Sequence, residues 1–198
     1  MDICVLAGGY GTRLKGLWDK PKCLVPYHGQ PVIEYIVNKA LKLKPRRVFL
    51  LLGHQASAVV KWREDCCPHR YVVPIIETEP SGTASAIRHA SPFITLPLMV
   101  LNGDTIPGYD LKILCNENIH QTVVAWCDGR YAGASILSFG GMNDVMCSHG
   151  TDLDVIINNP KFLRVHVTQF LDVGTPEGFH KTQMSLTWPK DYDCMEHT

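Results

Sequence analysis

The sequence predicts an α/β fold, namely a single-domain, Rossmann-like, doubly wound sheet that is mostly parallel. Two observations support this prediction. Short, continuously apolar runs alternate along the chain with segments whose apolar residues recur at helical spacing. Several of the apolar runs also end at glycine, which punctuates strands. Such a succession of strands and helices is typical of a doubly wound sheet.

The first half of the chain follows this alternation closely. The apolar run 3–6 is ended by glycines, which indicates a short buried strand. Residues 31–44 start with proline and carry apolar side chains at helical spacing, so they predict a helix. Residues 47–53 form a continuous apolar run, as buried parallel strands do. Further helices are expected at 56–64, 82–90 and 111–116, and further strands at 71–76, 98–101 and 122–126.

The pattern after residue 126 is less regular. Strands are expected at 131–139, 162–167 and 170–173, a short helix at 152–157 and a final helix at 176–183. Gly140-Gly141 predicts a turn. We expect one domain over residues 1–186 and a mobile polar tail over 187–198. Function is expected at the carboxyl ends of the strands, where doubly wound sheets form their crevice.

Composition excludes several classes of protein. Nineteen basic and 19 acidic residues give a formal net charge of zero, so no basic field favours nucleic acid or an anionic membrane. Apolar runs stay below the roughly 20 residues needed to span a bilayer, and the first strand leaves no room for a signal peptide. The eight cysteines lack a C-x-x-C pair and predict reduced thiols rather than a structural zinc site. We expect a cytoplasmic protein.

A glycine-rich loop follows the first strand and predicts a nucleoside triphosphate site. The loop and its flanks comprise Leu6, Ala7, Gly8, Gly9, Gly11 and Thr12. Glycines let backbone N–H groups approach an anion closely. Arg13 and Lys22 follow and can neutralise a polyphosphate. Leu14 replaces the third glycine of a dinucleotide fingerprint and G-K-[ST] is absent, so this is neither of the two common nucleotide loops.

The motif L-A-G-G-x-G-T-R-L followed by P-K resembles the signature of the sugar-1-phosphate nucleotidyltransferases. That family has a Rossmann-like, glycosyltransferase-A-like domain and joins a nucleoside triphosphate to a sugar phosphate, releasing pyrophosphate. Further similar segments occur in family order and extend the resemblance over residues 3–183. They are E-T-E-P-S-G-T-A from Glu77, V-L-N-G-D ending at Asp104, Ala132-Gly133, and F-L-D-V-G-T-P-E from Phe170. Among branches, the short heptose-1-phosphate guanylyltransferases are the most similar.

The resemblance implies a role for each matching residue. Arg13 would contact the β and γ phosphates, and Lys22 would lie near the reacting phosphates; with Asp104 they form the expected catalytic set. Asp104 and Asp172 would together hold Mg²⁺ against the triphosphate, since two carboxylates plus phosphates suit this ion. Glu77, Gly82 and Thr83 fall in the segment that binds the base.

Glu77 bears on which base is used. An ionised carboxylate only accepts hydrogen bonds. Guanine offers N1–H and an amino group side by side, and uracil or thymine offers N3–H. Cytosine offers an acceptor at N3 and only its amino group as donor. Glu77 therefore favours GTP, and less strongly UTP or TTP.

The acceptor side departs from the family. Relatives usually carry a lysine before an N-A-G segment, but no lysine lies between Lys112 and Lys161, and the intervening hairpin is deleted. Tyr131 replaces the asparagine. We hypothesise that Arg130 supplies the missing charge, with Asn102 and Gly133 also expected at the acceptor.

The predicted function is transfer of a nucleoside monophosphate from an NTP, with GTP favoured, to a sugar 1-phosphate of heptose type. Two alternatives stay open. One is a cytidylyltransferase for a phosphocholine-like or other phospho-acceptor, which the lost lysine favours and Glu77 opposes. The other is a non-catalytic nucleotide-sugar-binding or regulatory module. The expected partners are thus the triphosphate and a sugar phosphate, with neither nucleic acid nor membrane; a homodimer is compatible with the sequence, which does not fix the oligomeric state.

Overall fold

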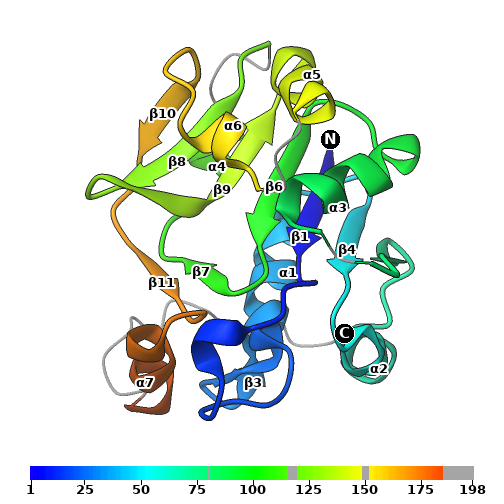
Figure 1. The fold of residues 1–198 in the computed structure, drawn as a ribbon, viewed down its shortest axis with the longest axis vertical. Coiled ribbons are helices and arrows are strands. Elements are labelled where there is room, and N and C mark those ends of the chain that lie inside the picture. Colours follow the sequence, from blue (N-terminus) through cyan, green and yellow to red (C-terminus); the bar gives the residue numbers. More distant parts are fainter. Residues whose placement is uncertain (80, 116–119, 149–151, 185–198) are drawn as a thin grey trace.

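The computed structural model describes residues 1–79, 81–115, 120–148 and 152–184, and its centre is a seven-stranded sheet (Figure 1). The strand order is β10-β8-β9-β6-β1-β4-β5. The strands are β1 (Asp2–Leu6), β4 (Val48–Leu52), β5 (Val72–Ile76), β6 (Leu98–Asn102), β8 (Val123–Cys127), β9 (Arg130–Leu137) and β10 (Leu163–His166). All neighbours run parallel except β9, which is antiparallel to both β6 and β8. The expected mostly parallel α/β sheet is confirmed.

Helices cover both faces of this sheet. Side chains alternate along β1, so Ile3 and Val5 join one buried cluster and Cys4 joins the other. The first cluster is covered by α1 (Val32–Lys42) and α2 (Ala56–Cys66) and receives α4 (Lys112–Cys115) and α7 (Pro176–Met184). The second is covered by α3 (Thr83–Ala90), α5 (Phe139–Cys147) and α6 (Asp154–Ile157). Figure 1 shows α3 and α6 in front of the sheet and α1 behind it.

Smaller elements complete the fold; β11 corresponds to the strand expected at 170–173, and the other small elements were not expected. Strand β7 (Thr105–Pro107) pairs antiparallel with β11 (Phe170–Asp172), and β2 (Pro26–Tyr27) pairs with β3 (Gln30–Pro31). Single 3₁₀ turns cover Thr12–Leu14, Lys22–Leu24 and Ser91–Phe93. The expected tail and residue 116 lie outside the described residues. Among the residues that the structure describes, no helix has both the length and the apolar character needed to cross a membrane.

The turn predicted at Gly140-Gly141 is wrong, because both glycines lie in α5. Ser138 caps this helix, and its hydroxyl accepts a hydrogen bond from the Gly141 N–H at 3.4 Å. The Ser138 hydroxyl also lies 2.9 Å from the Thr122 Oγ1. A Cβ on Gly141 would collide with that Thr122 oxygen. Glycine is therefore needed here so that the helix can approach the strand closely, not because the chain turns.

A buried carboxylate fixes the start of β1. The Asp2 side chain accepts hydrogen bonds from Arg46 Nε at 2.9 Å and from the Thr95 backbone N–H at 2.9 Å. Burial opposes ionisation of Asp2, but these hydrogen bonds outweigh it and hold the pKa of Asp2 below its ordinary value. Asp2 thereby joins β1 to the segments that lead into β4 and β6.

Candidate functional site

A cavity of about 320 Å³ opens at the carboxyl ends of β1, β4 and β6. This is the edge at which doubly wound sheets bind ligands. It is lined by Leu6, Ala7, Gly8, Gly9, Tyr10, Arg13, Lys22, Cys23, Leu51, Glu77, Gly82, Thr83, Ala86, Asn102, Gly103, Asp104, Asp152 and Asp172. Twelve of these residues are ones for which the sequence predicted a role, so the predicted donor-side residues, apart from Gly11 and Thr12, gather in one place.

The glycine-rich loop is shaped by close backbone contacts. The Gly103 N–H donates to the Leu6 carbonyl at 2.9 Å, and a Cβ on Gly103 would lie only 2.6 Å from that oxygen. A Cβ on Gly8 would lie 2.8 Å from the Gly53 nitrogen. Such distances leave room for glycine alone. Gly11 and Thr12 are outside the described cavity lining, but Gly11, at φ 67°, leads into the 3₁₀ turn that carries Arg13.

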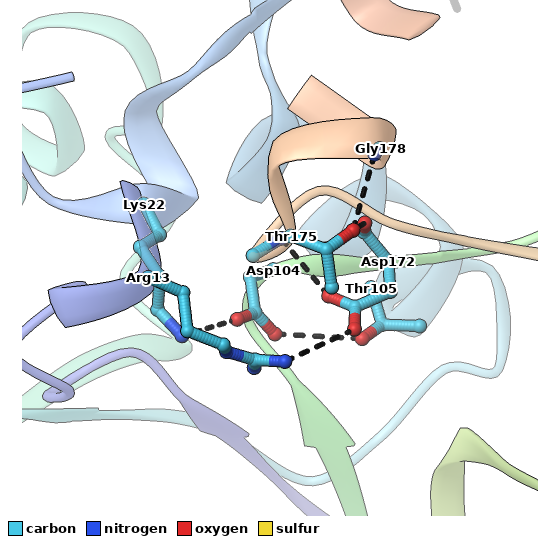
Figure 2. Close-up of polar contacts among 8 residues, drawn as sticks. Arg13, Lys22, Asp104, Thr105, Asp172, Thr175 and Gly178 are labelled. Carbon is cyan, nitrogen blue, oxygen red and sulfur yellow. Dashed lines mark hydrogen bonds and ion pairs between the residues drawn. The ribbon is translucent and has the colours of Figure 1, made fainter. Parts of the chain in front are cut away.

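Two ion pairs lie next to each other among the residues that line the cavity (Figure 2). Lys22 Nζ donates to Asp104 Oδ2 at 2.5 Å, and their side chains are only 20% and 14% exposed. Arg13 Nη1 lies 3.9 Å from Asp172 Oδ2, and the Arg13 side chain is largely exposed. Each expected phosphate-binding cation is thus paired with one of the expected metal-binding carboxylates.

Strand pairing brings the two aspartates together. Asp172 lies opposite Thr105 in the β7–β11 pair, next to Asp104. A Cβ on Gly174 would press against a carboxylate oxygen of each aspartate, so both carboxylates converge on this glycine. The Gly174 N–H also donates to Asp172 Oδ1 at 2.9 Å. Burial and the nearby Asp104 carboxylate raise the pKa of Asp172, although Arg13 opposes the shift.

Helix α1 holds the strand that follows Asp104. The Lys39 ammonium donates to the carbonyl oxygens of Pro107 and Tyr109 at 2.6 and 2.7 Å. Burial lowers the pKa of Lys39 to about 8. This contact fixes β7, and with it the register that places Asp172.

The aspartate pair fits a hard divalent cation. Its donors are carboxylate oxygens, which Mg²⁺ prefers, and Mg²⁺ commonly binds through one or two carboxylates plus substrate phosphates. Within the ranges that the structure describes, no group of three or more His, Cys, Asp or Glu side chains is arranged to hold a metal. The pair would therefore need phosphate oxygens to complete a metal site.

The predicted base-binding residues line the same cavity. The Glu77 N–H donates to the Leu52 carbonyl at 2.9 Å, so Glu77 directly follows the β4–β5 pair. Gly82 precedes α3 with φ 108°, a conformation that favours glycine. The Thr83 hydroxyl accepts a hydrogen bond from the Leu153 N–H at 3.1 Å.

That last contact introduces residues that the sequence analysis missed. Asp152, next to Leu153, adds a carboxylate to the lining, although its segment carries no recognisable motif. Tyr10 also lines the cavity, with its ring centroid 5.0 Å from that of His54. The remaining missed residues are Cys23, Leu51, Ala86 and Gly103. Burial and the Asp104 charge raise the pKa of the Cys23 thiol to about 12, which favours an inert thiol over a reactive one.

The predicted acceptor residues are not brought together. Asn102 lines the cavity, whereas Arg130 and Gly133 are outside the described lining. The Arg130 guanidinium lies over the Phe170 ring, 5.4 Å from its centroid. Gly133 has φ 77°, and a Cβ there would lie 2.6 Å from Thr105 Cγ2. The connection between β8 and β9 is a two-residue turn across which Cys127 pairs with Arg130.

Comparison with known proteins agrees with this geometry. The chain is 33% identical over 120 residues to D-glycero-alpha-D-manno-heptose 1-phosphate guanylyltransferase of Campylobacter jejuni subsp. jejuni serotype O:2, covering 60% of this chain and 54% of that protein. It is 33% identical over 107 residues to Bifunctional protein GlmU of Methanococcus maripaludis, covering 54% and 25% respectively. The chain thus spans about half, or less, of the length of these relatives.

Solved structures extend the similarity to most of the chain. A crystal structure of HddC from Yersinia pseudotuberculosis complexed with GMP-PN superimposes with a TM-score of 0.73 at 26% identity, covering 91% of this chain and 97% of that one. The predicted resemblance to sugar-1-phosphate nucleotidyltransferases is therefore confirmed. Residues 3–168 match the family described as the MobA-like NTP transferase domain, and the chain belongs to that family.

Proposed function

We propose that this chain transfers a nucleoside monophosphate from a nucleoside triphosphate, with GTP favoured, to a sugar 1-phosphate, giving an NDP-sugar and pyrophosphate. The observation that carries the proposal is the gathering of the glycine loop, two cations, two converging aspartates and Glu77 around one cavity. The similarity to a heptose 1-phosphate guanylyltransferase and to HddC complexed with GMP-PN supports guanine as the base and a heptose as the lead acceptor.

The reaction needs little proton transfer. An oxygen of the acceptor phosphate attacks the α-phosphorus of the triphosphate, and the bond from that phosphorus to the oxygen bridging to the β-phosphate breaks. Pyrophosphate leaves with the electron pair of that bond. A phosphate monoester has a second pKa of about 6, so near neutral pH it is already a nucleophile and requires no general base.

The residues of the cavity would stabilise the charge that moves during this step. The loop N–H groups and Lys22 would orient the phosphates, and Arg13 would neutralise charge on the β and γ phosphates. Positioned cations and dipoles of this kind commonly provide the largest share of catalysis at phosphorus. Glu77 would accept hydrogen bonds from N1–H and the amino group of guanine.

Asp104 and Asp172 would hold the Mg²⁺ ion. The described lining carries four carboxylates, Glu77, Asp104, Asp152 and Asp172, against two cations, Arg13 and Lys22. A triphosphate would add further negative charge to this acidic cavity, so a divalent cation is needed to offset it. When bound, the ion supplies charge stabilisation at the phosphate oxygens.

A pyrophosphate-release assay tests the proposal against its alternatives. GTP, UTP, TTP, CTP and ATP are each combined with Mg²⁺ and a panel of sugar 1-phosphates, including a heptose 1-phosphate, and phosphocholine. Release that is fastest with GTP and a sugar 1-phosphate is expected. Release only with CTP and phosphocholine would instead identify a cytidylyltransferase. No release from any pair, combined with a rise in melting temperature on adding GTP, would identify a non-catalytic binding module.

A further inference from the structure

We propose that Ser85 is a positioning residue for base selection, because its hydroxyl fixes the Glu77 carboxylate as a hydrogen-bond acceptor toward the base. The inference rests on the proposed function and adds to it a residue that does not itself contact the nucleotide. Glu77 lines the cavity, whereas Ser81 and Ser85 are outside the set of described residues that line it.

Two hydrogen bonds link these three side chains. Ser81 Oγ lies 2.8 Å from Ser85 Oγ, and Ser85 Oγ lies 3.2 Å from Glu77 Oε1. An ionised carboxylate has no proton to donate, so the Ser85 hydroxyl must donate to Glu77. A hydroxyl has one proton, so Ser81 must in turn donate to Ser85. The charge on Glu77 therefore sets the donor-to-acceptor direction of both hydrogen bonds.

Ser85, which donates to Glu77, belongs to a helix that is held rigidly by its packing. This helix is α3, whose Ala84, Ala86 and Ile87 are buried in the second of the two clusters that flank the sheet. Glu77, by contrast, follows the end of the edge strand β5 and is only partly buried. A carboxylate at such a position would otherwise sample several rotamers, and a hydrogen bond from a packed helix restricts that freedom.

The consequence is chemical selectivity. With one lone pair of Oε1 occupied by Ser85, the remaining carboxylate lone pairs can meet two adjacent donors, which guanine presents as N1–H and its amino group. Hypoxanthine presents N1–H alone, and cytosine presents an acceptor at N3. A fixed Glu77 carboxylate should therefore bind GTP more tightly than ITP. A freely rotating carboxylate should show a smaller difference between the two nucleotides.

The experiment measures dissociation constants of GTP and ITP, which differ only by the 2-amino group, by calorimetry in Mg²⁺. The wild-type protein is expected to bind GTP about tenfold or more tightly than ITP, as for a hydrogen bond to a charged acceptor. In S85A we expect this ratio to fall to roughly threefold, with most of the change in GTP affinity. Alanine favours helices, so S85A should fold.

Two further variants separate positioning from structure. S85T retains a hydroxyl and should restore most of the GTP preference. S57A makes the same substitution at an exposed position of α2 and should leave the ratio unchanged. Inorganic tripolyphosphate, which lacks a base, should bind wild type and S85A equally.

The outcomes distinguish a failure of the role of Ser85 from a failure of the assignment of guanine to Glu77. A wild-type protein that prefers GTP, together with an S85A variant that keeps the full ratio, overturns the role of Ser85 alone. A wild-type protein that binds GTP and ITP equally overturns both the assignment of guanine to Glu77 and the role of Ser85. A ratio that collapses in S85A and returns in S85T supports the proposal.

Discussion

At the scale of single residues, the cations expected to bind phosphate are held by carboxylates expected to bind metal. Lys22 Nζ lies 2.5 Å from Asp104 Oδ2, and Arg13 Nη1 lies 3.9 Å from Asp172 Oδ2. Each pairing places a positive charge beside a partly buried carboxylate. When a triphosphate and a divalent cation bind together, the four side chains can exchange these partners for phosphates and metal. We therefore expect metal and nucleotide to bind cooperatively.

The substitution K22M tests this exchange. Removing the ammonium leaves Asp104 unpaired, so Mg²⁺ alone should bind about tenfold more tightly, since it no longer meets a positive charge in contact with its ligand. Pyrophosphate release should nevertheless fall about 100-fold, because a cation at the reacting phosphates is lost. Calorimetry and the release assay measure the two effects. K20M, a change to an exposed lysine over the Trp18 ring, serves as the control and should alter neither value.

The diagnostic result for K22M is that Mg²⁺ affinity rises while the rate of pyrophosphate release falls. A general loss of folding would weaken both metal binding and turnover. Equal Mg²⁺ affinities in K22M and wild type would show that Lys22 does not compete with the metal for Asp104.

At the scale of elements, the two neighbouring glycines of α5 differ in whether packing requires glycine at their positions. A Cβ on Gly141 would collide with the Thr122 hydroxyl, which is buried and already shared with Ser138. A Cβ on Gly140 would lie 3.8 Å from Ser138 Oγ, an ordinary contact, and Gly140 is exposed. Gly140 is thus dispensable, whereas Gly141 is required by packing.

Chemical denaturation of two variants checks this difference. G140A should stabilise the protein by about 0.5–1 kcal/mol, because alanine loses less conformational freedom than glycine in a helix. G141A should destabilise it by roughly 2 kcal/mol, because the added methyl group overpacks a closed contact. Equal effects of the two substitutions would contradict this account of α5.

At the scale of the whole molecule, Asp2 contributes a pH-dependent part of stability. Its pKa is lowered in the folded protein, so the folded state binds fewer protons than the unfolded state around that pKa. The stabilisation is therefore fully present above the unfolded pKa of about 3.9. It is lost as pH falls through the lowered folded value.

D2N should remove this contribution. At pH 7 the variant should lose about 2 kcal/mol of unfolding free energy, because the Arg46 guanidinium then faces a neutral amide instead of a carboxylate. As pH falls from about 4 through the lowered pKa of folded Asp2, the stabilities of variant and wild type should converge. Urea titrations at several pH values measure both, with D19N at an exposed position as the control. A constant gap between variant and wild type across pH would refute the assignment to the charge of Asp2.

Much of the fold and of the donor side could be predicted from the sequence, since periodicity and the glycine loop are local signals. The strands predicted at 47–53 and 98–101 correspond to β4 and β6 within one residue at either end. Other features depend on contacts between distant segments. Gly141 looked like a turn because its partner Thr122 is remote in sequence. Asp152 lines the cavity next to Leu153, whose N–H donates to Thr83, a residue equally remote in sequence.

The acceptor side was harder to predict for the same reason. Charge and position in the sequence made Arg130 a candidate for the missing lysine. The structure places its guanidinium over the Phe170 ring instead, a contact that the β7–β11 pair creates. No local pattern around Arg130 indicates which way its side chain extends from the start of β9.

Isotope labelling tests whether the cavity directs attack at the α-phosphorus and releases pyrophosphate. The protein is incubated with Mg²⁺, a sugar 1-phosphate and GTP labelled on either its α- or its γ-phosphorus, and the products are separated. The account predicts that the α label appears in the NDP-sugar and the γ label entirely in pyrophosphate, with neither reaction in D104N. Transfer of the γ label to the sugar, or its release as inorganic phosphate, would contradict the account.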